Sequence, residues 1–89
     1  MLLIVEQPFI SEASEALIKA SAHTDHSVSL VLLGDGVYAQ YVPVLFDMNI
    51  AVLDIDAQRR GISIAPHATT ISAQAFARLS RQHPHWITL

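Results

Sequence analysis

The chain has 89 residues, of which 52% are hydrophobic and 15% are charged, with a formal net charge of −3 and no cysteine. This length predicts a single domain over residues 1–89. Only five residues are Lys or Arg, too few for a basic surface, so we expect no direct nucleic-acid binding. The absence of cysteine excludes a disulfide framework, a thiolate zinc site and a thiol nucleophile.

The hydrophobic residues are spread over short runs along the chain. None approaches the roughly 20 apolar residues of a membrane-spanning helix, so we expect no membrane association. The first residues, MLLIVEQP, lack the basic segment and the apolar length of a signal peptide, and we expect a cytoplasmic location. A domain of this size cannot bury so much apolar surface alone. We therefore expect an oligomer, with an unusually apolar monomer as the alternative.

Two strands and a helix are predicted in the first third of the chain. Leu2–Val5 and Val28–Leu33 are predicted strands. The second is apolar apart from Ser29, and its continuous apolarity from Leu30 to Leu33 indicates burial on both faces, as in a parallel sheet. Between them, Ser11 is expected to cap a helix with an acidic first turn. The spacing predicts that its buried face consists of Ala13, Ala16, Leu17 and Ala20.

The middle of the chain is less regular. The segment Val37–Phe46 could be a short helix, but Pro43 would kink or break its interior. Ile50–Leu53 and Ile62–Ala65 are predicted to be the third and fourth strands. Together with the flanking elements they predict an α/β fold, a three-layer α/β/α sandwich around a mostly parallel sheet of about five strands.

A short helical turn is predicted between the third and fourth strands, over residues 57–60. Asp54 or Asp56 is expected to cap its start, and Gly61 lies where a helix-ending residue needs positive φ. Arg59 and Arg60 could hold a phosphate or carboxylate, although favourable charge at a helix end explains them more simply. The two aspartates could coordinate Mg²⁺, but capping is again the simpler interpretation.

The last third of the chain predicts a helix and a strand. Ser72 is expected to cap a helix that runs to about Gln82. Phe76, Leu79 and His83 lie on one face of it. Trp86–Leu89 could form a fifth, terminal strand.

The most informative segment is the abrupt end of the second strand at Gly34-Asp35-Gly36. In open α/β sheets, ligands and partners meet the carboxyl ends of the strands. The candidate binding or interface residues are Asp35, Gly36, Val37, Tyr38 and Tyr41. The loop N–H groups could receive an anion or a partner loop. A strand-ending turn that uses the positive φ of glycine is the favoured alternative from the residues alone, and the two tyrosines could equally anchor an interface or fill the core.

Other constellations carry little chemistry. Five histidines are present, including the pairs His23/His26 and His83/His85, but no carboxylate or thiol accompanies them at a metal-binding spacing. No serine lies in a nucleophile-elbow pattern. We therefore predict no metal site, no cofactor and no catalytic residue.

Three blocks, in order along the chain, resemble those of the TusB/DsrH family. They are LLGDGVYA at 32–39, VLDIDAQRRG at 52–61, and a helix at 71–83 that carries Phe76 and is followed by Trp86. Some DsrH-like proteins carry a cysteine near the first helix. This chain has none, which favours the TusB side, and its segment between Ala39 and Ile50 is shorter than the family pattern.

The resemblance implies a small α/β subunit that assembles with sister subunits of the TusC/DsrF and TusD/DsrE types, or with itself. In that family the TusD/DsrE-type subunit carries the cysteine that takes up persulfide sulfur. The sulfur then serves 2-thiolation of the tRNA wobble uridine or, in the Dsr system, sulfur oxidation. The expectation is a non-catalytic subunit of a cytoplasmic sulfur relay. The alternatives are a stand-alone homo-oligomer that binds a small ligand at the strand ends, and a hydrolase using Asp35 and a histidine.

Overall fold

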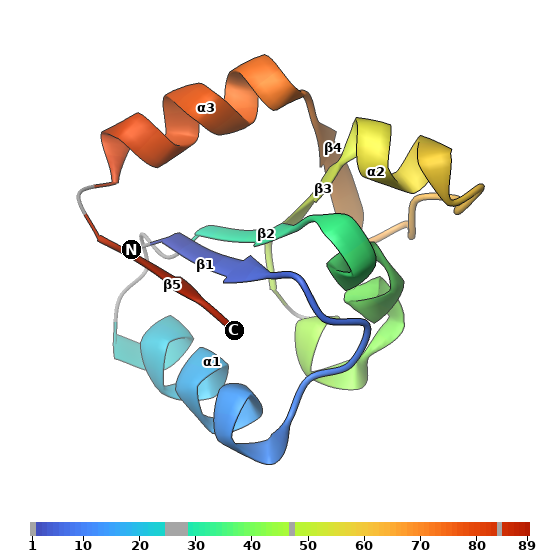
Figure 1. Ribbon diagram of the computed structural model, residues 1–89. Helices are drawn as coiled ribbons and strands as arrows, with labels where there is room; N and C mark the ends of the chain where they lie inside the picture. Colours follow the sequence, from blue (N-terminus) through green and yellow to red (C-terminus); the bar gives the residue numbers. More distant parts are fainter. Residues whose placement is uncertain (1, 25–28, 47, 84) are drawn as a thin grey trace.

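The computed structural model describes residues 2–24, 29–46, 48–83 and 85–89, and within them five strands form one sheet in which every pair of neighbours is parallel (Figure 1). The strands are β1 (Leu2–Val5), β2 (Ser29–Leu32), β3 (Ile50–Leu53), β4 (Ala68–Ile71) and β5 (Trp86–Thr88), in the order β4-β3-β2-β1-β5. The α-helices are α1 (Glu12–Thr24), α2 (Asp54–Arg59) and α3 (Ala73–Gln82), and two 3-10 helices are η1 (Gly34–Tyr41) and η2 (Pro43–Leu45). The predicted α/β class is confirmed.

Apolar clusters lie on both faces of the sheet, because successive residues of a strand point to opposite sides. Leu3 and Val5 of β1 join one cluster with Ile18 of α1, whereas Leu2 and Ile4 join a second cluster. Phe76 and Leu79 of α3 pack on this second cluster. The sheet is thus flanked by α1 on one side and α3 on the other (Figure 1).

The central strands β2 and β3 are parallel neighbours. Leu30, Val31 and Leu32 are all at most 1% exposed, so β2 is buried on both faces. Of the predicted strand Val28–Leu33, Val28 lies outside the described residues and Leu33 follows the strand as the residue before η1. The segment Val37–Phe46, for which the sequence left a helix open, forms most of η1 and all of η2. Pro43 is the first residue of η2, a position at which proline is favoured, and the first helix ends before it.

The prediction of a strand at Ile62–Ala65 is wrong. The fourth strand is β4, which begins at Ala68, three residues after the end of the predicted strand. Backbone groups of the expected strand are instead held by the buried side chain of Gln40. Its Nε2 donates to the carbonyl of Ser63 at 3.0 Å, and the N–H of Ala65 donates to its Oε1 at 2.8 Å. Pro66, which has no N–H to donate to a ladder, then directs the chain into a turn before β4.

The start of α1 is as predicted, but its buried face is not. The Oγ of Ser11 accepts from the N–H of Ser14 at 3.1 Å, which is an N-cap. The residue directed into the core is Ile18, which is fully buried, while the alanines of the predicted face are exposed: Ala13, Ala16 and Ala20. One large aliphatic side chain buries more apolar area than three methyl groups, and it sets the rotation of the helix.

The last third of the chain follows the prediction closely. The Oγ of Ser72 accepts from the N–H of Ala75 at 3.1 Å and caps α3. Gly61 has a φ of +64° after α2. The terminal strand exists as β5 and pairs with β1.

Candidate functional site

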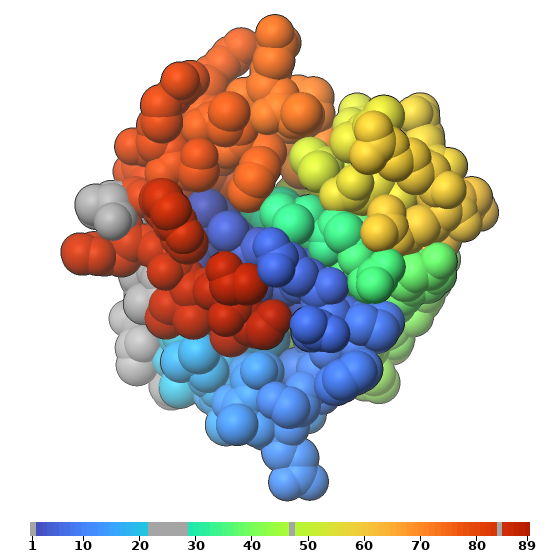
Figure 2. All heavy atoms as spheres, in the orientation of Figure 1, coloured from blue at the N-terminus to red at the C-terminus, as the bar shows by residue number. Residues whose placement is uncertain are grey.

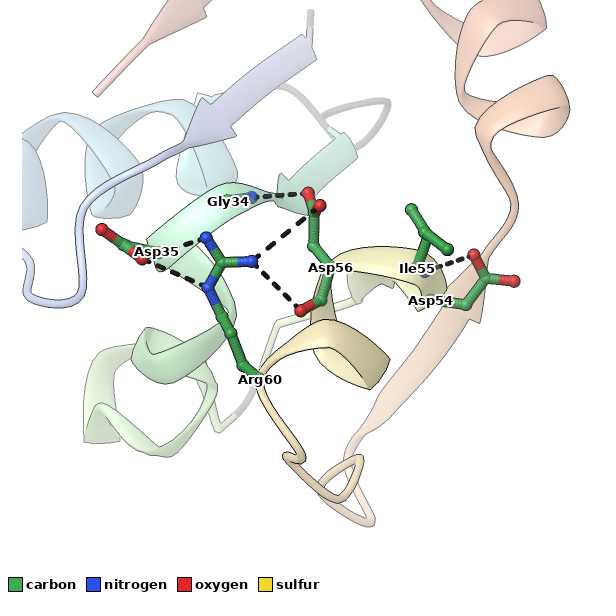
Figure 3. A network of polar contacts seen from close by, with 6 residues as sticks. All are labelled: Gly34, Asp35, Asp54, Ile55, Asp56 and Arg60. Atoms are coloured by element: carbon green, nitrogen blue, oxygen red, sulfur yellow. Dashed lines mark hydrogen bonds and ion pairs between the residues drawn. The ribbon is translucent and has the colours of Figure 1, made fainter.

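The carboxyl ends of β2 and β3 bring together two segments that lie 22 residues apart in the sequence. Gly34, which follows β2 and adopts a φ of +57°, directs its backbone N–H toward the start of α2. That N–H donates to Oδ2 of Asp56 at 2.7 Å (Figure 3). The Asp56 side chain is only 16% exposed, so the protein's own carboxylate occupies the amino end of η1.

Arg60 links the same two segments from the end of α2. Its Nε and Nη2 both donate to Oδ1 of Asp35 at 3.1 Å, and its Nη1 donates to the backbone carbonyl of Asp56 at 3.2 Å (Figure 3). The Arg60 side chain is 25% exposed and that of Asp35 is 62% exposed. Because Asp35 is well solvated, this ion pair adds little stability, and its main effect is to orient both side chains.

Neither Asp54 nor Asp56 is the N-cap expected from the sequence, because α2 begins at Asp54, three residues before the predicted turn over residues 57–60. The residue before the helix is Leu53, which has no side-chain hydrogen bond to offer. Asp54 accepts locally, from the N–H of Ile55 at 2.6 Å, whereas Asp56 bonds across to Gly34. Arg60 does bond to a carbonyl of its helix, as charge at a helix end predicts, and it also reaches Asp35.

The candidate residues of η1 divide into buried and exposed sides. Gly36 is buried against the end of β1, and Val37 is fully buried in the core. Tyr38 and Tyr41 are 48% and 54% exposed. Residues three apart in a 3-10 helix lie one above the other. The two tyrosines therefore lie on one side of η1, which we call the tyrosine face, and neither is buried in the core, as the core-filling alternative required.

Gln40 is the residue that the sequence analysis missed. It is fully buried and joins η1 to the segment before β4 through Ser63 and Ala65. Its backbone carbonyl also contacts Nε2 of His67 at 2.7 Å. A lone glutamine in a segment of uncertain conformation gives no signal by itself, because its partners lie more than twenty residues away.

The histidines do not gather into a metal site in the described part of the chain, where no group of three or more His, Cys, Asp or Glu side chains converges. His67 stacks edge-on against Phe46 with ring centroids 5.0 Å apart. His26 and the side chain of His23 lie outside the described residues. Within the same part of the chain, no helix is both long and apolar enough to cross a bilayer.

Comparison with known proteins adds no family assignment. Neither a protein-family model nor a curated protein matches the chain.

Proposed function

We propose that this protein is a non-catalytic subunit of a cytoplasmic sulfur-relay complex of the TusBCD/DsrEFH type, supporting 2-thiolation of the tRNA wobble uridine. The observation that carries the proposal is the block Leu32–Ala39, which resembles the family motif and presents Asp35 and Tyr38 at the carboxyl edge of the sheet. This is the edge at which open α/β folds meet ligands and partners.

Composition limits the chemistry of such a subunit. Sulfur relays pass a persulfide between thiolates, and this chain has no cysteine. It therefore acts by shaping and supporting a neighbouring subunit's site, through contacts rather than by holding sulfur. The tyrosine face suits this role, since aromatic residues are enriched at protein interfaces.

The alternatives receive less support from the geometry. A small anion at the strand ends would need the N–H of Gly34, which already binds Asp56. A hydrolase would need Asp35 beside a histidine, but Asp35 pairs with Arg60, and His67 contacts Phe46 and Gln40.

The test is genetic. The gene is deleted in its host, and 2-thiouridine in bulk tRNA is measured by mass spectrometry. We expect the modification to be lost and to return with the wild-type chain. Normal thiolation in the deletion strain would contradict the tRNA role, and a defect in sulfur oxidation in that strain would assign the subunit to the Dsr type of pathway.

A further inference from the structure

β5 is an edge strand of the sheet, and no strand of the described residues pairs with its outer side. Trp86 is 55% exposed and Ile87 is 36% exposed, and Thr88 is exposed as well. The strand lies between α3 and α1 in Figure 1, and in Figure 2 the atoms of the C-terminal segment (red) reach the surface between these two helices. Natural edge strands discourage pairing by being short, or by carrying a charge or a proline. β5 is short, with three residues, but it carries neither a charge nor a proline.

Alternate residues of the β5 segment direct their backbone N–H and C=O groups toward β1. The N–H of Leu2 donates to the carbonyl of His85 at 3.3 Å, and the N–H of Leu89 donates to the carbonyl of Ile4 at 2.7 Å. The N–H and C=O of one residue point to the same side of a strand, and successive residues alternate. Trp86 and Thr88 therefore direct their N–H and C=O groups away from the sheet, where a further strand would bind.

We propose that this edge binds β5 of a second copy of the chain, antiparallel, about a twofold axis at Ile87. In this register Trp86 lies opposite the partner's Thr88, and each pair exchanges both of its N–H···O=C bonds. Every outward donor and acceptor of the two strands is then satisfied. The result is one continuous sheet through both copies. This inference goes beyond the proposed function and does not depend on it.

The side chains of this register are also self-complementary, which favours a second copy over an unrelated strand. Ile87 lies opposite the partner's Ile87 on the face of α1, since its neighbour Leu3 belongs to the α1-side cluster. On the other face Trp86 lies against the partner's Thr88, an aromatic and β-branched pair of the kind that stabilises antiparallel sheets. The opposite edge, β4, exposes Thr69 and Thr70 instead and offers no such apolar match.

The first test is a cross-link. Residues opposite each other at a non-hydrogen-bonded position have Cα atoms about 4.5 Å apart, within the range that a disulfide spans. Because the chain has no cysteine, Ile87→Cys introduces a single thiol. We expect a covalent dimer under mild oxidation. Thr70→Cys, an exposed position on the opposite edge strand, is the matched control and should form no covalent dimer. Equal cross-linking of both variants, or none with Ile87→Cys, would overturn the proposal.

The second test removes one outward donor. Thr88→Pro deletes an N–H that points away from β1 and so leaves the ladder to β1 intact. Light scattering of the isolated wild-type chain at rising concentration should show a dimer, with a blue shift in the emission of the single Trp. Thr88→Pro should remain monomeric with its fold intact by circular dichroism. A wild-type chain that stays monomeric at every concentration contradicts the proposal, as does a dimer that survives Thr88→Pro.

Discussion

Gly36 lies so close to the carbonyl of Val5 that a Cβ at position 36 would overlap the carbonyl carbon and oxygen. The contact holds the first turn of η1 against the end of β1. The N–H of Leu33, just before this turn, also donates to the same carbonyl at 3.0 Å. Glycine is thus required at position 36 by space and not by a positive φ, which in this turn occurs at Gly34.

Replacing Gly36 with alanine should therefore cost more than replacing Gly34. The Cβ of Gly36→Ala meets rigid backbone, and we expect a loss of about 3 kcal/mol or more in the free energy of unfolding. Gly34→Ala meets nothing within 4 Å and pays only for its positive φ, about 1–2 kcal/mol. Urea unfolding of both variants measures the difference, and equal losses would show that the close approach to Val5 is not the constraint.

The hydrogen bond between Gly34 and Asp56 gives a second prediction. Asp56→Ala removes a charge-assisted bond from a side chain that is 16% exposed, and we expect a loss of about 2 kcal/mol in stability. Asp54→Ala is the matched control from the same helix turn. It loses only a local bond to its neighbour Ile55, worth less than about 1 kcal/mol. A larger effect at Asp54 than at Asp56 would contradict the stabilising role of the bond between Gly34 and Asp56.

Local signals predicted the elements that depend on local chemistry. Ser11 and Ser72 were identified as caps because the side-chain oxygen of an N-cap bonds within its own first turn. The strands Leu2–Val5 and Ile50–Leu53 were found from their apolar runs. The same kind of local reasoning predicts a strand at Ile62–Ala65 from its weak alternation, whereas the fourth strand lies at Ala68–Ile71.

Two of the errors share one physical cause, which is that distant residues decide them. The conformation of Ser63 and Ala65 is set by Gln40, and the partner of Asp56 is Gly34. Neither relationship leaves a pattern in the local sequence. The contact between Asp56 and Gly34 could be anticipated once β2 and β3 were placed side by side, because the segments that follow parallel neighbours meet at one edge of the sheet.

Gln40 yields a third prediction. Gln40→Leu keeps the approximate volume of the side chain but leaves the N–H of Ala65, a buried residue, without its partner. The carbonyl of the exposed Ser63 loses one donor and keeps that of the Tyr41 hydroxyl. One unpaired buried polar group costs about 1–3 kcal/mol, so we expect a loss of about 2 kcal/mol. Gln82→Leu, at an exposed position of α3, should change stability by less than about 0.5 kcal/mol. Thermal or urea unfolding of the pair is the measurement, and similar stabilities would contradict the role of Gln40.

The last prediction separates folding from assembly on η1. Tyr38 is 48% exposed, while its neighbour Val37 is fully buried. Tyr38→Ala should lower the urea midpoint of the isolated chain less than Val37→Ala does, because about half of the Tyr38 side chain is already exposed to solvent. If the tyrosine face meets a sister subunit, the same variant should recover less of that subunit in affinity purification from the native host, since aromatic side chains dominate interface energies.

Val37→Ala is the converse control. It removes buried apolar surface from the core and should cost about 2 kcal/mol of stability, while the surface presented to a partner is unchanged at temperatures where the variant is folded. Full recovery of partners with Tyr38→Ala would place the contact elsewhere on the molecule.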